Sequence, residues 1–126
     1  MPEIPEELRY TEDHEWVKLT DGEAQYGITD YAQEELGDIV YIELPEVGED
    51  VEKGDMIGVI ESVKTVSDLY APMTGTITKV NDELEESPET INDDPYGDGW
   101  IVKIEYEDKS EYESLMDAEE FKLHTE

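Results

Sequence analysis

The sequence predicts a mainly β fold, a flattened barrel or sandwich with short helices near the N-terminal third and at the C-terminus. Short runs of alternating apolar and polar residues recur along the chain, and turn residues separate them. The length of 126 residues suits one domain, and eight Tyr and two Trp remain for a core although 36% of the residues are charged. We therefore expect a single domain over residues 1–126, with an acidic lead-in over residues 1–7.

Seven runs have the composition of β-strands. The turn residues Asp21-Gly22 separate the first two runs, and Pro45 ends the third. The seven runs cover residues 10–19, 23–28, 38–44, 56–63, 67–71, 76–80 and 100–106. Between the last two runs we expect a polar loop over residues 81–99.

Helix-capping patterns predict three short helices. Thr29 or Asp30 can cap the first helix, Gln33 has the capping-box spacing from Asp30, and Gly37 is a typical stop. Two further capping boxes lie in a C-terminal helical segment over residues 107–126 and predict helices over 111–116 and 118–123: Ser110 with Glu113, and Asp117 with Glu120.

The chain carries an extreme negative charge, with 37 acidic and 8 basic residues and a formal net charge of −29. Like charges repel at ordinary ionic strength, but at about 1 M salt the Debye length falls to roughly 3 Å. Because the acidic residues are scattered along the sequence, we interpret them as adaptation to a salt-rich, halophilic cytoplasm. The alternative is an acidic face that binds a basic partner. Nucleic acid is not expected as a partner, since phosphates need Lys and Arg.

Composition also disfavours several kinds of site and location. The chain has no Cys, and none of its apolar runs approaches the roughly 20 residues of a membrane span. The acidic N-terminus does not resemble a signal peptide, so we expect a soluble cytoplasmic protein. His14 and His124 stand far apart without a cluster, and no metal site is expected. The Asp-rich stretch 92–99 lacks the EF-hand register and is expected to be a loop before a packed Trp100.

A single lysine between two strand-like runs is the strongest functional clue. Residues 59–63 lead in and residues 66–70 lead out, so Lys64 is predicted at the tip of a hairpin. A free lysine is protonated at neutral pH, and the neighbours Glu61 and Asp68 favour the charged amine, which disfavours a catalytic Schiff base. Position alone leaves two interpretations open: an ordinary solvated lysine, or one that a separate enzyme acylates.

The sequence around Lys64 contains several short motifs, and others lie far from it. Near the lysine are Glu61-Ser62-Val63-Lys64, Ser67-Asp68 and Ala71-Pro72 followed by Gly75. The more distant motifs are His14-Glu15-Trp16-Val17, Gly27-Ile28-Thr29-Asp30-Tyr31-Ala32, Leu36-Gly37-Asp38, Leu44-Pro45, Ile91-Asn92, Pro95-Tyr96, Gly99-Trp100 and Lys103-Ile104. Together, over about residues 8–121, they resemble the glycine cleavage system H-protein family. The resemblance implies a lipoyl/biotinyl-type barrel-sandwich hybrid.

What this resemblance implies is a carrier and not an enzyme, a monomer with lipoic acid in amide linkage on Lys64. In this family the arm accepts the aminomethyl group of glycine from the pyridoxal-phosphate glycine decarboxylase as carbon dioxide leaves. It presents that group to the tetrahydrofolate-dependent aminomethyltransferase, and dihydrolipoamide dehydrogenase then reoxidises the dithiol. A lipoate-attaching enzyme is a fourth implied partner. The implied role lies in glycine catabolism and one-carbon metabolism.

The resemblance also implies that the loaded arm folds back against the protein body. Its amine should be cationic, and Glu15 and Asp68 stand at matching positions where a carboxylate would hold it. Asp13 replaces the small hydroxyl residue of the family, which leaves its role open. Glu61, Val63 and Ser67 supply the context of the attachment hairpin. The alternative for Glu15 and Asp68 is ordinary surface acidity.

Three other classes of protein remain as alternatives. Biotinyl domains flank the lysine with methionines, whereas Val63 and Thr65 stand here. Lipoyl domains of 2-oxoacid dehydrogenases favour an acidic residue directly before the lysine, and they lack the regions that match at 14–17 and 95–100. An unmodified acidic binding module would not need the lysine, and its Lys64→Arg variant should stay active.

Overall fold

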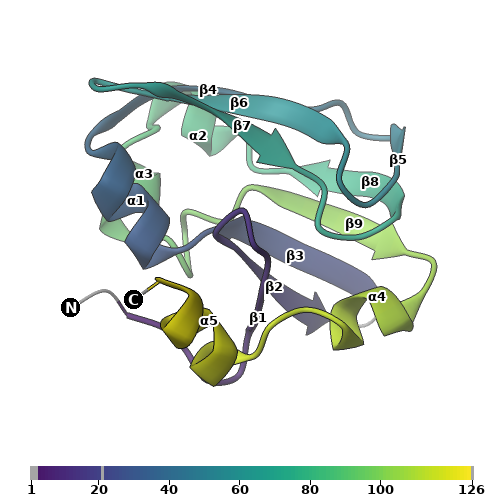
Figure 1. The fold of residues 1–126 in the computed structure, drawn as a ribbon. Coiled ribbons are helices and arrows are strands. Elements are labelled where there is room, and N and C mark those ends of the chain that lie inside the picture. The colour runs from purple at the N-terminus through teal and green to yellow at the C-terminus, as the bar shows by residue number, and fades with distance from the viewer. Residues whose placement is uncertain (1–2, 21, 126) are drawn as a thin grey trace.

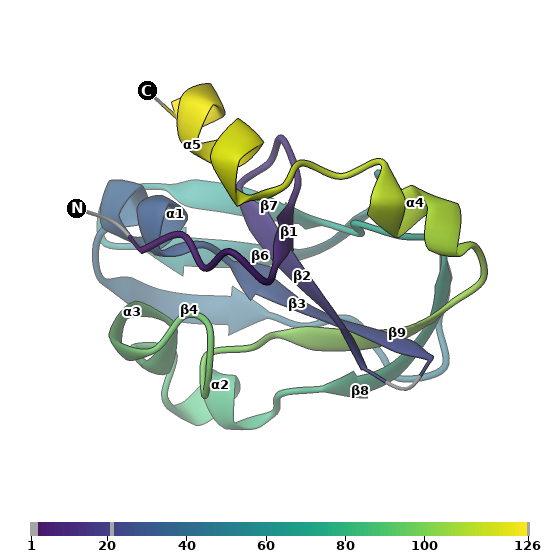
Figure 2. The same cartoon turned by 90° about the horizontal axis from the view of Figure 1, so that it is seen from below.

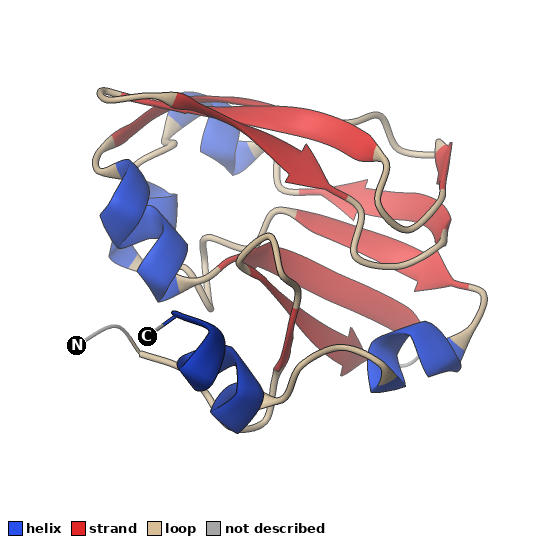
Figure 3. Cartoon of the chain, in the orientation of Figure 1, coloured by secondary structure: helices blue, strands red, loops and turns tan. Residues whose placement is uncertain are grey.

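The structure, a computed structural model, describes residues 3–20 and 22–125. Two antiparallel β-sheets face each other, and short helices cover their ends (Figures 1 and 3). The larger sheet has the order β1-β2-β3-β9-β8-β5 and the smaller sheet has the order β4-β6-β7. The strands are β1 (Arg9–Tyr10), β2 (Glu15–Thr20), β3 (Glu23–Ile28), β4 (Ile39–Glu43), β5 (Asp50–Val51), β6 (Met56–Ser62), β7 (Val66–Tyr70), β8 (Gly75–Val80) and β9 (Val102–Tyr106). The predicted mainly β sandwich is confirmed.

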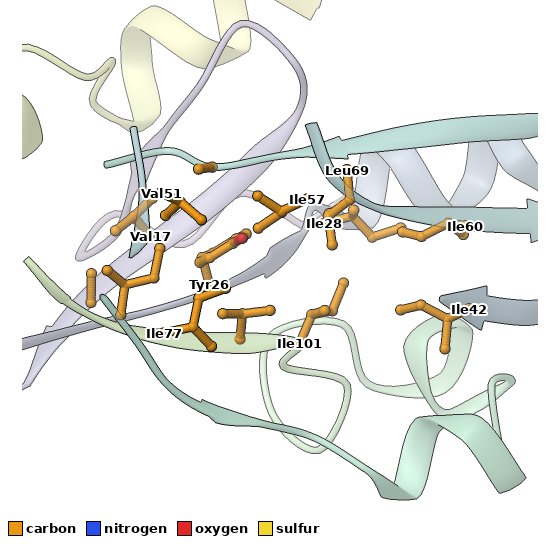
Figure 4. Packing of buried hydrophobic residues seen from close by; sticks show 14 of the residues in the cluster. Val17, Tyr26, Ile28, Ile42, Val51, Ile57, Ile60, Leu69, Ile77 and Ile101 are labelled. Carbon is orange, nitrogen blue, oxygen red and sulfur yellow. The ribbon is translucent and has the colours of Figure 1, made fainter. Parts of the chain in front are cut away.

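The core fills the space between the two sheets. Alternate residues of each strand point inward, because successive side chains of a strand lie on opposite faces. Figure 4 shows side chains from the larger sheet meeting those of the smaller sheet. The larger sheet contributes Val17, Tyr26, Ile28, Ile77 and Ile101 beside β9, and the smaller sheet contributes Ile42, Ile60 and Leu69. Each such aliphatic side chain stabilises the fold by about 1.5–3 kcal/mol relative to exposure.

Within the described residues, five short helices complete the fold: α1 (Asp30–Leu36), α2 (Glu83–Glu86), α3 (Thr90–Asp93), α4 (Lys109–Glu113) and α5 (Ala118–Thr125). The Thr29 hydroxyl accepts a hydrogen bond from the Ala32 N–H at 3.1 Å and caps α1, while Gly37 ends the helix with φ +82°. Asp117 and Glu120 exchange side-chain bonds with each other's N–H groups at the start of α5. None of the described helices has the length and apolar character of a membrane span.

A second, smaller core lies under α5. Phe121 of this helix stacks on Tyr10 of β1 with ring centroids 4.7 Å apart, and Leu8 and Trp16 close the cluster. Figure 2 shows α5 above β1, on the outer side of the larger sheet. This packing ties the C-terminal helix to the segment that leads into β2.

The structure corrects several details of the predicted elements. The strand expected over residues 10–19 breaks at His14, whose φ of +65° turns the chain between β1 and β2. The loop expected over residues 81–99 contains α2 and α3, and the turn before β6 contains the short strand β5. Asp108, not Ser110, caps α4 by accepting a bond from the Ser110 N–H. Residues 1, 2, 21 and 126, parts of the predicted lead-in, first turn and C-terminal segment, lie outside the described residues.

Candidate functional site

Lys64 lies in the turn between β6 and β7, at the exposed tip of the hairpin that projects to the upper left in Figure 1. The Ser62 hydroxyl oxygen accepts hydrogen bonds from the N–H groups of Lys64 and Thr65, each at 3.1 Å. The Ser62 N–H donates to the Thr65 carbonyl at 2.8 Å and closes the turn. These bonds fix the turn through Ser62 and backbone groups, and not through the lysine side chain. The sequence motif contained Ser62, but nothing in the pattern revealed this role.

The hairpin tip is also tied to the segment between α1 and β4. The Val63 N–H donates to the Asp38 carbonyl at 3.0 Å. Glu61, exposed on β6, faces Tyr41 of β4 and Val66 of β7 in the sheet register. Among the described residues, four large hydrophobic side chains at this end of the sheet are at least half exposed: Val40, Tyr41, Val63 and Val66. They form an apolar surface around Lys64 on a strongly acidic protein.

A pocket of about 210 Å³ lies beside the hairpin, along α1. Its walls come from the turn before β2, from α1 and from the inner side of β6 and β7. The apolar part of the lining is Ile28, Ala32, Leu36 and Ile60, and the polar part includes Asp13, His14, Glu15, Tyr31, Glu35, Ser67 and Asp68. The pocket therefore combines an apolar wall with several carboxylates.

Glu15 is the most buried carboxylate of this pocket, with 2% of its surface exposed. Its Oε2 accepts a hydrogen bond from the Tyr70 N–H at 2.9 Å, and its Oε1 accepts one from the Thr11 hydroxyl at 3.4 Å. Burial raises the pKa of Glu15 to about 8; the Tyr70 N–H opposes this shift and Asp13 adds to it. None of these contacts is with a positively charged group.

The same glutamate covers the edge of the smaller sheet. β7 is an outer strand, and Tyr70 N–H points away from β6 toward Glu15. Because backbone N–H groups of a strand alternate in direction, the Asp68 N–H points to the same side. The Asp68 side chain is exposed at the pocket and accepts a bond from the Tyr70 hydroxyl at 3.3 Å, and this carboxylate raises the pKa of Tyr70.

Glu15 separates two pockets. The second pocket, of about 310 Å³, shares Asp13 and Glu15 with the first one but is lined otherwise by residues such as Thr11, Lys53, Pro72 and Met116.

The structure brings some of the predicted site residues together and leaves others apart. Glu15, Ser67 and Asp68 line one pocket, and Asp13, whose role was left open, lines it as well. Glu61 and Val63 stay on the exposed hairpin with Lys64. Tyr31 and Leu36 of α1 could not be predicted as pocket residues, because the sequence of a seven-residue helix does not show which of its faces is buried.

The two histidines are close in space, so the expectation that they lie far apart is wrong. Their ring centroids are 5.6 Å apart, and the His14 ring also contacts Tyr31 and Phe121. Burial, and next the charge of His124, lower the pKa of His14. Among residues 3–20 and 22–125, no group of three or more potential ligands is arranged to hold a metal ion.

The chain is similar to known proteins over nearly its full length. The family model described as glycine cleavage H-protein matches residues 8–126. The glycine cleavage system H protein of Anaeromyxobacter sp. (strain K) is 52% identical over 124 residues, which cover 98% of this chain and 97% of that protein. The H protein of Listeria monocytogenes serotype 4a (strain HCC23) is 55% identical over 118 residues, 94% of each chain. A crystal structure of the H protein from Mycobacterium marinum matches with a TM-score of 0.90 and 42% identity, covering 97% of this chain and 98% of that one.

Proposed function

Because this chain belongs to the glycine cleavage H-protein family, we propose that it is a non-catalytic carrier whose Lys64 holds lipoic acid in amide linkage. The observation that carries this proposal is the exposed lysine at a turn that Ser62 fixes. Because the bonds that fix the turn do not involve the lysine side chain, Lys64 can be acylated while its turn stays intact. The lipoyl group, when bound, supplies a disulfide that carries the aminomethyl group of glycine from a pyridoxal-phosphate decarboxylase to a tetrahydrofolate-dependent transferase and is reoxidised by dihydrolipoamide dehydrogenase.

The pocket along α1 suits the lipoyl group. Leu36, Ala32 and Ile60 offer an apolar wall for a hydrocarbon chain, and the pocket begins next to the hairpin that carries Lys64. At the far end Glu15 offers a carboxylate that is shielded from water. This order of apolar wall and buried acid fits an arm that is apolar along its length and cationic at its loaded end.

Glu15 and Asp68 would hold the cationic amine of the loaded arm. A cation beside Glu15 lowers the pKa of that carboxyl from about 8, so the glutamate releases its proton as the amine enters. The resulting ion pair is partly shielded, where charge-assisted hydrogen bonds are strong. Asp68, at the open side of the pocket, adds a second carboxylate. An amine held beside the buried Glu15 would be shielded from water, which would protect the carried group from hydrolysis.

The hairpin would also be the contact surface for the partner enzymes, including the one that attaches lipoate. Each of them must take Lys64 or its arm into an active site. Val63, Val66 and Tyr41 surround the lysine and are exposed, so they would bury apolar surface when an enzyme encloses the tip.

Intact-mass analysis of the protein from its native host tests the proposal. We expect a lipoyl mass increment that maps to Lys64 and disappears in Lys64→Arg, with unchanged thermal stability because the bonds that fix the turn come from Ser62. A biotin increment would indicate a biotinyl carrier instead. A bare Lys64 in cells that degrade glycine, or a Lys64→Arg variant with full activity, would contradict the proposal and favour an unmodified binding module.

The pocket has its own test. In the loaded protein, Glu15→Gln should release the aminomethyl group faster, by about tenfold for the loss of roughly 1.4 kcal/mol of ion-pair stabilisation. Asp68→Asn should give a smaller increase, because that carboxylate is more exposed to solvent. Release rates equal to wild type in both variants would show that neither acid holds the amine.

A further inference from the structure

The Lys64 side chain lies across Gly37, at the point where α1 ends. A Cβ atom built on Gly37 would stand 3.1 Å from Cε, 3.5 Å from Cδ and 3.6 Å from Nζ of Lys64. The lysine methylene chain thus occupies the side of Gly37 that any other residue would fill. A side chain at position 37 would require the Lys64 stem to move by a few tenths of an ångström.

Gly37 is fixed in place from two directions. The Asn92 amide donates to the Gly37 carbonyl at 2.9 Å, and its Oδ1 accepts from the Ile39 N–H at 2.9 Å. Between them, the Asp38 carbonyl accepts the Val63 N–H of the hairpin. The backbone at Gly37 is the seat on which the Lys64 side chain lies. Hydrogen bonds therefore hold this seat and the turn that carries Lys64 together as one unit.

This seat lies at one end of the pocket. Leu36 and Glu35, which directly precede Gly37, line the pocket, and Ala32 and Tyr31 continue its wall along α1. A chain that leaves Lys64 over Gly37 therefore starts beside Leu36, a residue of the pocket wall. Glu15 lies among the lining residues beyond it.

From this geometry we infer that Gly37 is a positioning residue: its missing side chain seats the methylene stem of Lys64 and directs the root of the arm into the pocket along α1. The inference rests on the proposed function, since the arm is the lipoyl group on Lys64. A lysine side chain loses up to about 2 kcal/mol of rotamer freedom when it is ordered. Because the seat orders the stem beforehand, less of that entropy is lost when the loaded arm enters the pocket.

Other glycines provide a control for backbone strain. Gly22 and Gly48 also have positive φ, +85° and +94°, but nothing lies within 4 Å of a Cβ built on either. Substitution by Ala at these positions strains the backbone without touching Lys64. At Gly37, with φ +82° and ψ −159°, Ala brings both backbone strain and a tight contact that displaces the lysine stem.

Nuclear Overhauser measurements on the unmodified protein test the seat directly. We expect a strong cross-peak between the Lys64 ε-methylene and Gly37 α protons in the wild type, retained in Gly48→Ala. The absence of this cross-peak from the wild type would overturn the inference. This test needs neither a lipoyl group nor a stable Gly37 variant. It therefore tests the contact between Lys64 and Gly37 even if Gly37→Ala fails to fold.

The consequence for the arm is measured in the lipoylated, aminomethyl-loaded protein. We expect Gly37→Ala to lose the carried group about five-fold faster than wild type, which corresponds to about 1 kcal/mol, while Gly48→Ala and Gly22→Ala stay within two-fold. Thermal melts of all three variants measure the loss of stability from backbone strain, separately from the release rate. Equal release rates in Gly37→Ala and the controls would overturn the inference. Lack of lipoylation with the cross-peak intact would instead refute the proposed function alone.

Discussion

At the scale of single residues, Glu15 combines a structural and a chemical role. Its carboxyl group accepts the N–H of Tyr70 at the edge of β7 and is nearly inaccessible to solvent. A neutral carboxylic acid satisfies that contact at low cost, whereas an isolated carboxylate in the same place is unfavourable. The position is therefore suited to bind a cation that replaces the proton.

The stability of the empty protein should depend on pH through this residue. The unfolded chain loses the Glu15 proton near its ordinary pKa of 4.5, whereas the folded protein keeps it up to about 8. The destabilisation from Glu15 is thus absent below pH 4.5, grows as pH rises, and is constant above about 8. In denaturant melts, Glu15→Gln should match wild type at acidic pH and exceed it by a few kcal/mol at pH 8 and above.

The exposed Glu34 supplies the matched control, since Glu34→Gln removes the same charge outside the pocket. A stability difference between Glu15→Gln and wild type that stays constant across the pH range would show that Glu15 does not retain its proton.

At the scale of the elements, the β6–β7 hairpin presents Lys64 on a surface that partner enzymes can enclose. Val66 of the hairpin and Val47 of a distant loop are 58% and 59% exposed. The change Val→Thr keeps the shape of the side chain and adds a hydroxyl group. With glycine decarboxylase, Val66→Thr should raise KM for the lipoylated protein about three- to ten-fold, for a loss of roughly 1 kcal/mol of apolar burial.

In the same assay Val47→Thr should leave KM unchanged, and kcat should be unchanged in both variants because neither side chain reaches the reacting atoms. An equal effect of the two substitutions would mean that the hairpin surface is not a specific contact.

Most elements could be predicted from local chemistry. The helix α1 followed from Thr29 and Gly37, and the hairpin followed from the apolar runs on both sides of Lys64. The helices α2 and α3 could not be predicted, because four residues are too few to show a 3.6-residue period. The burial of Glu15 and the contact of Gly37 with Lys64 could not be predicted from the sequence either, since both depend on segments distant in sequence.

At the scale of the whole molecule, the net charge opposes the compact fold that the family shares. The motifs around Lys64 predicted the family, and the match over residues 8–126 confirms it. The net charge of −29 is carried by a fold of 126 residues, so repulsion among carboxylates opposes folding in dilute buffer. The adaptation to salt stays a prediction from composition.

Stability should therefore rise steeply with KCl. Screening at about 1 M salt removes most of the repulsion between exposed carboxylates. A gain of about 2 kcal/mol would raise Tm by roughly 10 °C in a chain of this size. Thermal melts from 0.05 M to 2 M KCl measure this, and NaCl at matched strength separates screening from a specific effect of potassium. A melting temperature that is flat over this range would favour the acidic-face interpretation.

The hydrogen bonds of Ser62 have a consequence for the rate of glycine breakdown in the cell. Since they preserve the turn whatever is attached at position 64, copies without the proposed lipoyl group would keep the same turn as copies that carry it. Such copies would bind the decarboxylase without accepting the aminomethyl group, and would therefore act as competitive inhibitors. Overproduction of this polypeptide during lipoate starvation should therefore slow glycine breakdown, and the supply of cofactor must keep pace with synthesis of the chain.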